Sequence, residues 1–195
     1  MSPNGMLGHV QLSRDSIITA ALELLDSFGL ADMTMRRVAS QLGVAPGALY
    51  WHVANKQELI AAIADEIIAP VLTPESGADS PAVLCLRLRG ALLARRDGAE
   101  LVGAALSQPD SRARADVEKQ LELTLDDHGL DTDDRRIGAA TLLHLVLGST
   151  TLEQSRRQLA EATGAGESHG ASAESDFRRG LELCLAGLAA TGSIQ

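Results

Sequence analysis

The sequence predicts an all-α protein in which a small N-terminal module precedes a larger helical domain. Apolar residues recur at helical spacing nearly throughout the 195 residues, and no segment alternates convincingly as a strand does. Capping residues and glycines stand where these helices would begin and end. Prolines and glycines interrupt the pattern between residues 69 and 81. We therefore expect a flexible segment at 1–12, a module at 13–68, a linker at 69–81 and a second domain at 82–195.

Each helix of the N-terminal module has its own boundary signals. Serine, threonine and asparagine side chains cap helix starts, glycine ends helices, and proline suits a first turn. The expected helices start after Ser13 and stop at Gly29, cover 35–42 behind the cap Thr34, cover 46–52 from Pro46, and cover 56–68 behind the cap Asn55.

Further helices are expected after the linker, with small polar residues at 163–173 predicting a loop before the last one. Their ranges are 83–96, 99–106, 112–128, 133–160 behind the cap Thr132, and 174–190.

The composition excludes several classes of protein. The formal net charge is −9 and 45% of the residues are hydrophobic, which is typical of a globular protein. The uncharged stretch at 137–152 is too short for a membrane span, and residues 1–12 lack the basic start of a signal peptide. Cys85 and Cys184 share no metal-ligand spacing with a histidine. We expect a soluble cytoplasmic protein with no metal and no cofactor.

Two short expected helices separated by a turn at Gly43 have the layout of a helix-turn-helix. In such a unit the first helix braces the second, which can then enter a DNA major groove. Residues 33–57 contain no acid, but they contain Arg36, Arg37 and Lys56. Because phosphate contacts supply much of the affinity for DNA, this window in an acidic chain predicts a DNA-binding face.

The residues around this turn form a specific string. Residues 34–44 read TMRRVASQLGV, residues 47–53 read GALYWHV, and Asn55-Lys56 follow. The string resembles the DNA-binding domain of the tetracycline-repressor (TetR) family and is closest in motif to the tetracycline-repressor branch. The motif RDGA at 96–99, and HLVLG at 144–148 followed by Leu152-Glu153, extend the resemblance more weakly into the second domain.

The resemblance implies an operator-contacting surface, on which Thr34 contacts phosphate, Arg36 contacts a base, and residues 45–48 face the groove floor. These last side chains carry no hydrogen-bond donor, so they could read only thymine methyls or groove shape. Arg36 and Tyr50 would then carry much of the readout. Core packing is an equal alternative for Trp51, and a solvated surface charge is the alternative for Arg37. The implied DNA-binding residues are Thr34, Arg36, Arg37, Ala45, Pro46, Gly47, Ala48, Tyr50, Trp51, His52 and Lys56.

The expected helices at 133–160 and 174–190 each carry an apolar stripe. The resemblance implies that they pair with their copies as a four-helix bundle, whereas core packing within one chain is the alternative. The candidate dimer residues are Ile137, Leu145, Gly148, Leu152, Phe177, Leu181, Leu185 and Leu188.

The resemblance also implies an inducer pocket inside the second domain. In tetracycline repressors a histidine just after the RDGA turn binds magnesium together with the drug, and the corresponding residue here is Val102. An alkyl side chain cannot coordinate a hard cation, so magnesium-tetracycline is not the expected effector. Phe177 is the one aromatic residue of this domain, so we expect an aliphatic pocket and a mostly apolar ligand. Candidate ligand-binding residues are Arg89, Val102, Gln108, Thr141, His144 and Thr151, with a satisfied core histidine as the alternative for His144.

The sequence therefore predicts a homodimeric, ligand-responsive DNA-binding regulator. We expect a repressor that leaves its double-stranded operator when a small, largely apolar effector binds, with the helix at 56–68 as the lever between the domains. The alternatives are a helical protein-interaction adaptor and a regulator without a ligand. The sequence shows no nucleophile elbow, phosphate loop or metal cluster, so an enzyme is not expected.

Overall fold

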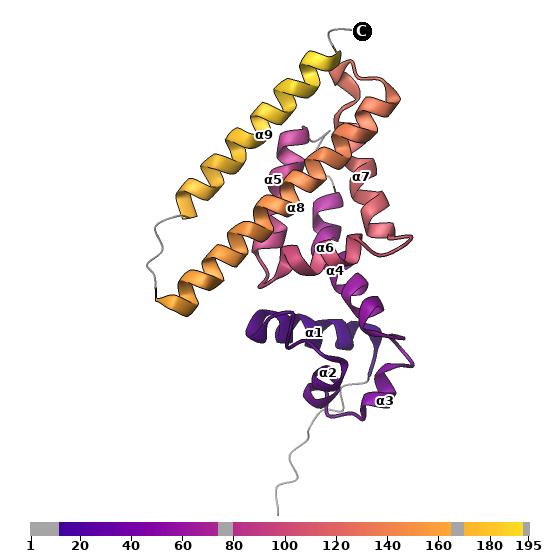
Figure 1. The fold of residues 1–195 in the computed structure, drawn as a ribbon. Coiled ribbons are helices and arrows are strands. Elements are labelled where there is room, and N and C mark those ends of the chain that lie inside the picture. Colours follow the sequence, from indigo (N-terminus) through magenta and orange to yellow (C-terminus); the bar gives the residue numbers. More distant parts are fainter. Residues whose placement is uncertain (1–11, 74–79, 165–169, 193–195) are drawn as a thin grey trace, which may run out of the picture.

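The computed structural model describes residues 12–73, 80–164 and 170–192, and within these ranges it contains helices and no strand. A small head formed by α1, α2 and α3 lies at one end of the molecule, and a bundle of longer helices forms the rest (Figure 1). The all-α prediction is confirmed. Apart from its last residue, the segment expected to be flexible at 1–12 falls outside the described residues.

Capping residues set the boundaries of the first four helices, which are α1 (Arg14–Phe28), α2 (Met35–Gln41), α3 (Pro46–Leu49) and α4 (Lys56–Leu72). The Ser13 hydroxyl accepts from the Ser16 N–H, and Ser16 returns a hydrogen bond, so the two form a capping box. Thr34 and Asn55 cap α2 and α4 in the expected way. Gly29 ends α1 at φ +85°, a conformation that residues with a Cβ rarely adopt.

Two expected boundaries in this part of the chain are wrong. The third helix is shorter than 46–52, because α3 ends at Leu49 and the chain turns through Tyr50 to His52. The expected linker at 69–81 begins too early, because α4 continues to Leu72 with Pro70 inside it. Arg87 of the next helix donates to the Pro70 and Thr73 carbonyl oxygens at 2.7 and 2.8 Å, which satisfies acceptors at this helix end.

The second domain contains α5 (Pro81–Leu93), α6 (Gly98–Leu106), α7 (Arg112–Thr124), the 3₁₀ turn η1 (Asp126–His128), α8 (Thr132–Thr163) and α9 (Gly170–Gly192). Asp131, not Thr132, caps α8, and its carboxylate accepts from the Asp134 N–H at 2.8 Å. The loop expected at 163–173 is also shorter than predicted, since α9 already begins at Gly170.

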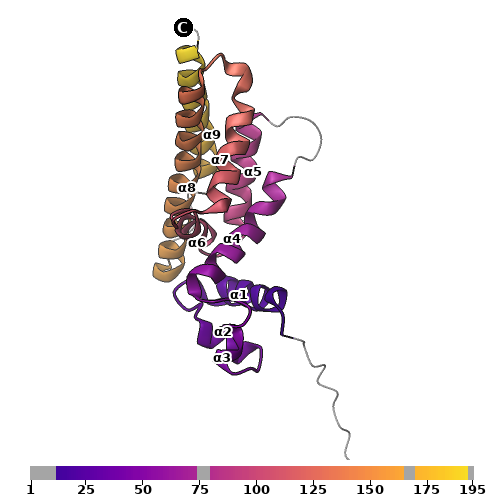
Figure 2. The same cartoon turned by 90° about the vertical axis from the view of Figure 1, so that its right-hand side faces the viewer.

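The helix α4 connects the head to the bundle (Figure 2). It packs on α1 within the head and on α5, α6 and α7 within the bundle. Buried apolar side chains accordingly form one continuous cluster that extends from α1 to α9. A movement of α4 would therefore change packing contacts in both parts of the molecule.

The two longest helices, α8 and α9, lie side by side along the outside of the bundle. Gly138 permits close packing near the end of this pair, because a Cβ there would lie 3.1 Å from Leu188 Cδ2. None of the helices in the described ranges has the length and apolar character needed to span a bilayer.

Candidate nucleic-acid interface and regulatory core

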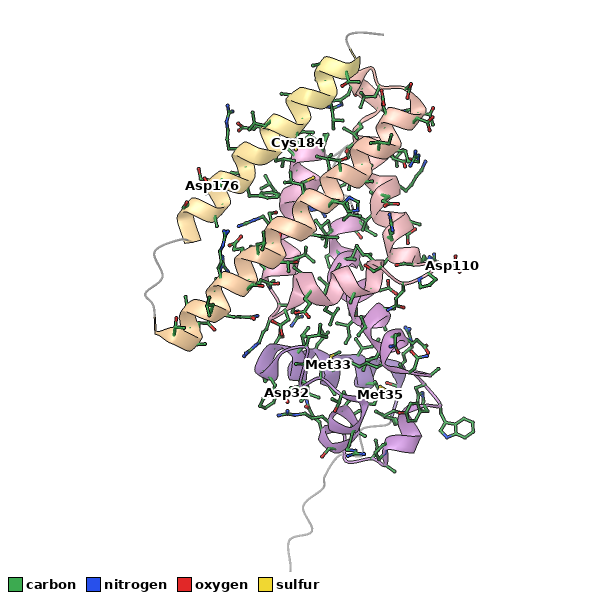
Figure 3. All side chains as sticks on the ribbon, in the orientation of Figure 1. Asp32, Met33, Met35, Asp110, Asp176 and Cys184 are labelled. Carbon is green, nitrogen blue, oxygen red and sulfur yellow. The ribbon has the colours of Figure 1, made fainter. Side chains whose placement is uncertain are left out.

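The short helix α3 is held on the head by buried side chains on one of its faces and in the turn that follows it. Leu49 and Val53 are fully buried, as are Met33 and Val38 of the preceding segment and α2. Figure 3 labels Met33 and Met35, which lie inside the head. This support leaves the other side of α3 and the start of α2 facing solvent.

The solvent-facing side of these elements carries the predicted DNA-contacting residues. Tyr50 is 52% exposed and Trp51 is 89% exposed. The core alternative for Trp51 is therefore wrong, because the indole is almost entirely outside. We call this surface the recognition face; its exposed or half-buried members are Thr34, Arg36, Ala45, Pro46, Gly47, Ala48, Tyr50, Trp51, His52 and Lys56.

The three basic residues near the recognition face differ in how they are engaged. Arg37 Nη1 donates to Asp32 Oδ1 at 2.8 Å, and its guanidinium lies 3.9 Å from the centroid of the Phe28 ring. Arg36 and Lys56 make no ion pair with any described residue. The Arg37 charge is thus engaged within the head, and its contact with DNA stays a prediction, while Arg36 and Lys56 keep their charges available to phosphate or base.

The start of α4 is a second part of the same surface. The Asn55 side chain accepts from the Glu58 N–H at 2.8 Å, and Glu58 Oε2 accepts from the Ala54 N–H at 2.7 Å. This reciprocal capping fixes the first turn of α4, and with it the position of Lys56. The positive end of the helix dipole and the lysine then face the same side.

In the second domain, one predicted ligand residue lies in a buried polar cluster. Arg89 on α5 is 7% exposed, and its Nη2 donates to Glu153 Oε2 on α8 at 2.5 Å. The Arg89 guanidinium also lies 5.3 Å from the ring centroid of Phe177 on α9. A buried charge needs such partners, because desolvation is costly.

The other predicted ligand residues do not gather around Arg89. Val102 is fully buried in α6, and Thr151 is half-buried on α8. Gln108 instead donates to the Gln57 carbonyl oxygen of α4 at 3.1 Å. Thr141 and His144 are exposed on α8 in the single chain, and their role in ligand binding stays a prediction. Residues three and four apart share a helix face, and these two share theirs with the predicted dimer stripe.

That stripe of α8 is exposed within a single chain. Ile137, Gly148 and Leu152 face outward, and Leu145 is half-buried. Leu159, one further heptad along the stripe, and Leu183 of α9 are also large, apolar and exposed, and neither is among the predicted dimer residues. The seven-residue spacing from Leu152 to Leu159 could have predicted that Leu159 belongs to this stripe.

The predicted stripe of α9 is wrong at two positions. Phe177 and Leu181 are buried in the chain's own core, and Leu185 and Leu188 pack partly against the same core. The α9 helix has apolar residues on more than one face, and spacing alone does not say which face a helix turns inward. The exposed face of α9 carries Leu183 instead.

The turn between α5 and α6 makes a connection to the head that the sequence did not predict. Asp97 adopts the left-handed conformation at φ +54°. Its Oδ2 accepts from the Leu30 N–H at 2.7 Å, and its Oδ1 accepts from Gln158 Nε2 of α8. One carboxylate thus joins the α1–α2 loop, the start of α6 and the distal half of α8.

Neighbouring residues reinforce this junction. Arg95 Nη1 donates to Asp26 Oδ2 of α1 at 2.5 Å. Gln154 of α8 accepts from the Ala99 N–H at 3.0 Å and donates to the Leu92 and Arg95 carbonyl oxygens at 3.2 and 2.8 Å. The turn is therefore fixed to α8 on one side and to the head on the other.

Burial shifts the pKa of two titratable side chains in the described ranges. Burial raises the pKa of the Cys85 thiol to about 12, and nearby Cys184 on α9 adds to the shift (Figure 3). Burial also raises the pKa of Asp65, against the opposing effect of Arg14. Within the described residues, no cluster of three or more His, Cys, Asp or Glu side chains could hold a metal ion.

Comparison with known proteins places these features in context. A family model described as bacterial regulatory proteins, tetR family, matches residues 17–63. Tetracycline repressor protein class D of Escherichia coli is 36% identical over 151 residues, which cover 74% of this chain and 67% of that protein. The class E repressor of Escherichia coli is 35% identical over 156 residues, covering 76% and 72%.

Solved structures give the same result. Mycobacterium smegmatis BioQ is 40% identical, with a TM-score of 0.82, and the match covers 92% of this chain and 99% of BioQ. A crystal structure of BioQ with its double-stranded DNA operator is 38% identical, with a TM-score of 0.77 and coverage of 92% and 99%. Streptomyces coelicolor ActR in complex with (S)-DNPA is 27% identical, with a TM-score of 0.73 and coverage of 92% and 98%.

Proposed function

The chain belongs to the tetR family of bacterial regulatory proteins and is a DNA-binding transcriptional regulator, not an enzyme; from this premise we propose how its residues perform that role. The recognition face enters the major groove of an operator, two copies of the chain bind together, and an effector in the second domain releases them. The observation that carries the proposal is the exposed recognition face, where Trp51 is 89% exposed above a fully buried Leu49.

On DNA, the recognition face divides into reading and positioning residues. Arg36 is exposed and makes no ion pair with any residue that the structure describes, so its guanidinium can donate to a guanine edge. Residues 45–48 offer alkyl surface and no side-chain donor, which suits thymine methyls and groove shape. Thr34, Trp51, His52 and Lys56 supply contacts to the phosphate backbone, and Tyr50 contacts the groove wall. The protein acts in the cytoplasm, where this DNA lies.

A second copy of the chain covers the exposed apolar face of α8 and α9. Ile137, Leu152, Leu159 and Leu183 are each more than half exposed, and residues of this size rarely stay exposed together on one face. Pairing through these helices brings two recognition faces to half-sites about 34–36 Å apart, or a multiple of that distance.

The effector acts through the contacts between the second domain and the head. Solved relatives include a TetR of Acinetobacter baumannii in complex with minocycline and ActR in complex with (S)-DNPA, so related chains take small organic ligands. Here Val102 is fully buried at the position where tetracycline repressors carry a histidine ligand for magnesium, which argues against a magnesium-bound drug. Both α4 and the Asp97 turn connect the ligand domain to the head, so a shift in either alters the spacing of the two recognition faces.

Arg36→Ala tests the DNA contact directly. We expect binding to a duplex from upstream of the protein's own coding sequence to weaken by about 1–3 kcal/mol, because one base contact is lost. Filter binding measures this affinity. The matched control is Arg112→Ala, whose side chain is 92% exposed on α7 away from the recognition face, and it should bind as the parent does. Equal affinity of the Arg36→Ala variant and the parent would favour the adaptor alternative.

A further inference from the structure

The interior of the second domain contains polar groups that the fold itself does not satisfy. In the described residues, the buried polar side chains are Arg89, Thr150, Glu153 and Gln154. Gln154 is fully used by the α5–α6 turn. Arg89 Nε and Thr150 Oγ1, in contrast, are buried and have no hydrogen-bond partner among the described residues.

The residues that carry these two atoms are both linked to Glu153, Arg89 by an ion pair and Thr150 by one helical turn. Glu153 Oε2 is 2.5 Å from Arg89 Nη2, so the guanidinium of α5 reaches α8 at this point. Thr150 precedes Glu153 by three residues on α8, and both side chains are buried, so both lie on the inward face of that helix. An unpaired buried N–H or O–H normally costs free energy, and most such groups in proteins find a partner.

The carboxylate that neutralises Arg89 is shared with a second guanidinium. Glu153 accepts from two guanidinium groups, those of Arg89 and Arg157. The Arg89 charge contributes slightly to the lowered pKa of Glu174 on α9, but that carboxylate is exposed and is engaged by Arg178 at 3.0 and 2.7 Å. Glu153 therefore divides its charge between the buried guanidinium of Arg89 and the half-exposed guanidinium of Arg157, and the Arg89 guanidinium could take a second anionic partner.

The surroundings of the cluster are apolar. Cys85, Val146 and Leu181 are all buried, and they lie one helical turn from Arg89, Thr150 and Phe177, respectively. The Phe177 ring lies against the Arg89 guanidinium. The Cys85 thiol stays protonated and uncharged, because burial raises its pKa. A ligand entering here would place one anionic group among donors and the rest of its surface among hydrocarbon.

We propose that the core between α5, α8 and α9 binds an effector with one carboxylate on an otherwise apolar body, whose carboxylate accepts from Arg89 Nε and the Thr150 hydroxyl. This inference rests on the proposed function, since it names the chemistry of the effector. The same stretch of α8 continues to Gln154 and Gln158, which hold the Asp97 turn, and Asp97 holds Leu30 of the head. A ligand bound at Thr150 is thus connected to the head through a continuous series of contacts.

Calorimetry with a chemical series tests the proposal on the full-length protein. The probes are saturated straight-chain carboxylates from butanoate to dodecanoate, each compared with its methyl ester. At least one carboxylate is expected to bind about tenfold or more tightly than its ester, because only the acid offers a charged acceptor. If no carboxylate binds, or if each ester binds as its acid does, the proposal is wrong.

Two variants locate the site. Thr150→Val keeps the side-chain shape and removes the unpaired hydroxyl, so carboxylate affinity should fall about tenfold while the melting temperature of the ligand-free protein holds or rises. Thr124→Val on α7 is the matched control: its hydroxyl already donates to the Leu121 carbonyl oxygen at 2.7 Å, so its loss lowers the melting temperature and leaves carboxylate binding unchanged. The double variant Arg89→Met/Glu153→Gln removes both charges and should abolish the preference for acid over ester.

The outcomes separate this inference from the proposed function. A Thr150→Val variant that binds carboxylate like the parent, or melts as early as Thr124→Val, overturns the carboxylate site. Operator affinity is measured on the same samples without ligand. If it is intact while the carboxylate preference is absent, only this inference fails; if the parent does not bind operator, the proposed function fails.

Discussion

In the head, the interior is apolar and the aromatic side chains of Tyr50 and Trp51 face solvent, whereas in the second domain Phe177 is buried beside a charged cluster. Every buried polar side chain among the described residues belongs to the second domain. The two parts share one continuous core, so this difference does not come from separate folding.

The difference follows from what each part has to recognise. DNA is larger than the head, so the head must present its contacts outward from a rigid apolar support. A small effector is surrounded by its binding domain, so that domain must place polar groups inside and accept the cost of burying them. Substitution of buried polar residues in the second domain should therefore change mainly stability. Substitution on the exposed recognition face should change mainly DNA binding.

The largest effect is expected at the buried ion pair. Glu153→Gln leaves Arg89 without a counterion in the core, and we expect the free energy of unfolding to fall by about 3–5 kcal/mol. Urea denaturation measures it. The double variant Arg89→Met/Glu153→Gln, which removes both charges, should recover most of this loss. If Glu153→Gln leaves the free energy of unfolding unchanged, the buried charge of Arg89 does not need Glu153, and the proposed difference between the two interiors is wrong.

The junction between the two parts should come next. A Cβ at Gly29 would lie 2.6 Å from Asp97 Oδ2, and its φ of +85° is unfavourable for any other residue. Gly29→Ala should therefore lower the free energy of unfolding by about 2–3 kcal/mol. Gly43→Ala is the matched control, because its φ is +67° but nothing lies within 4 Å of its Cβ position, and a cost of about 1–2 kcal/mol is expected. Equal losses of unfolding free energy in the two variants would show that contact with Asp97 adds nothing to the cost of a Cβ at Gly29.

On the recognition face the effect should fall on binding alone. Trp51→Ala removes a side chain that is 89% exposed, so thermal unfolding should be unchanged. Operator affinity should drop by about 1 kcal/mol, the contribution of one hydrogen bond to phosphate. A lower melting temperature with unchanged affinity would reverse the roles assigned to the outside and inside of the head.

The smallest effect concerns the two thiols. Because burial raises the pKa of Cys85 to about 12, its protonated form is favoured by folding, and the stabilisation is lost only as the pH rises above the thiol's ordinary value near 9.0. At pH near 8, iodoacetamide should therefore modify half-buried Cys184 and leave Cys85 intact, as mass spectrometry of the native protein can show. Modification of Cys85 at a similar rate would mean that the core opens readily around α5.

Local signals in the sequence predicted most of the fold. Ser13, Thr34 and Asn55 cap helices, and Gly29 ends one, because each of these effects depends on residues a few positions apart. Asp131 was missed as the cap of α8 because Thr132 beside it is an equally good capping residue. The recognition face could be anticipated for the same reason, since its residues are nearly contiguous.

The second domain was less predictable because its contacts join distant segments. Glu153 meets Arg89 across 64 positions, and Asp97 meets Leu30 across 67. Neither pair has a spacing that could reveal it. Whether Phe177 of α9 turns inward depends on the neighbouring helices, so its burial could not be read from its own stripe.

The exposure of Trp51 also gives the molecule its own optical probe. The chain contains a single tryptophan, so all indole emission comes from the recognition face. Its spectrum in the free protein should be that of a water-exposed indole, and docking against duplex should quench or blue-shift it. Operator occupancy can thus be titrated without a dye. The reporting side chain is not in direct contact with changes made in the second domain.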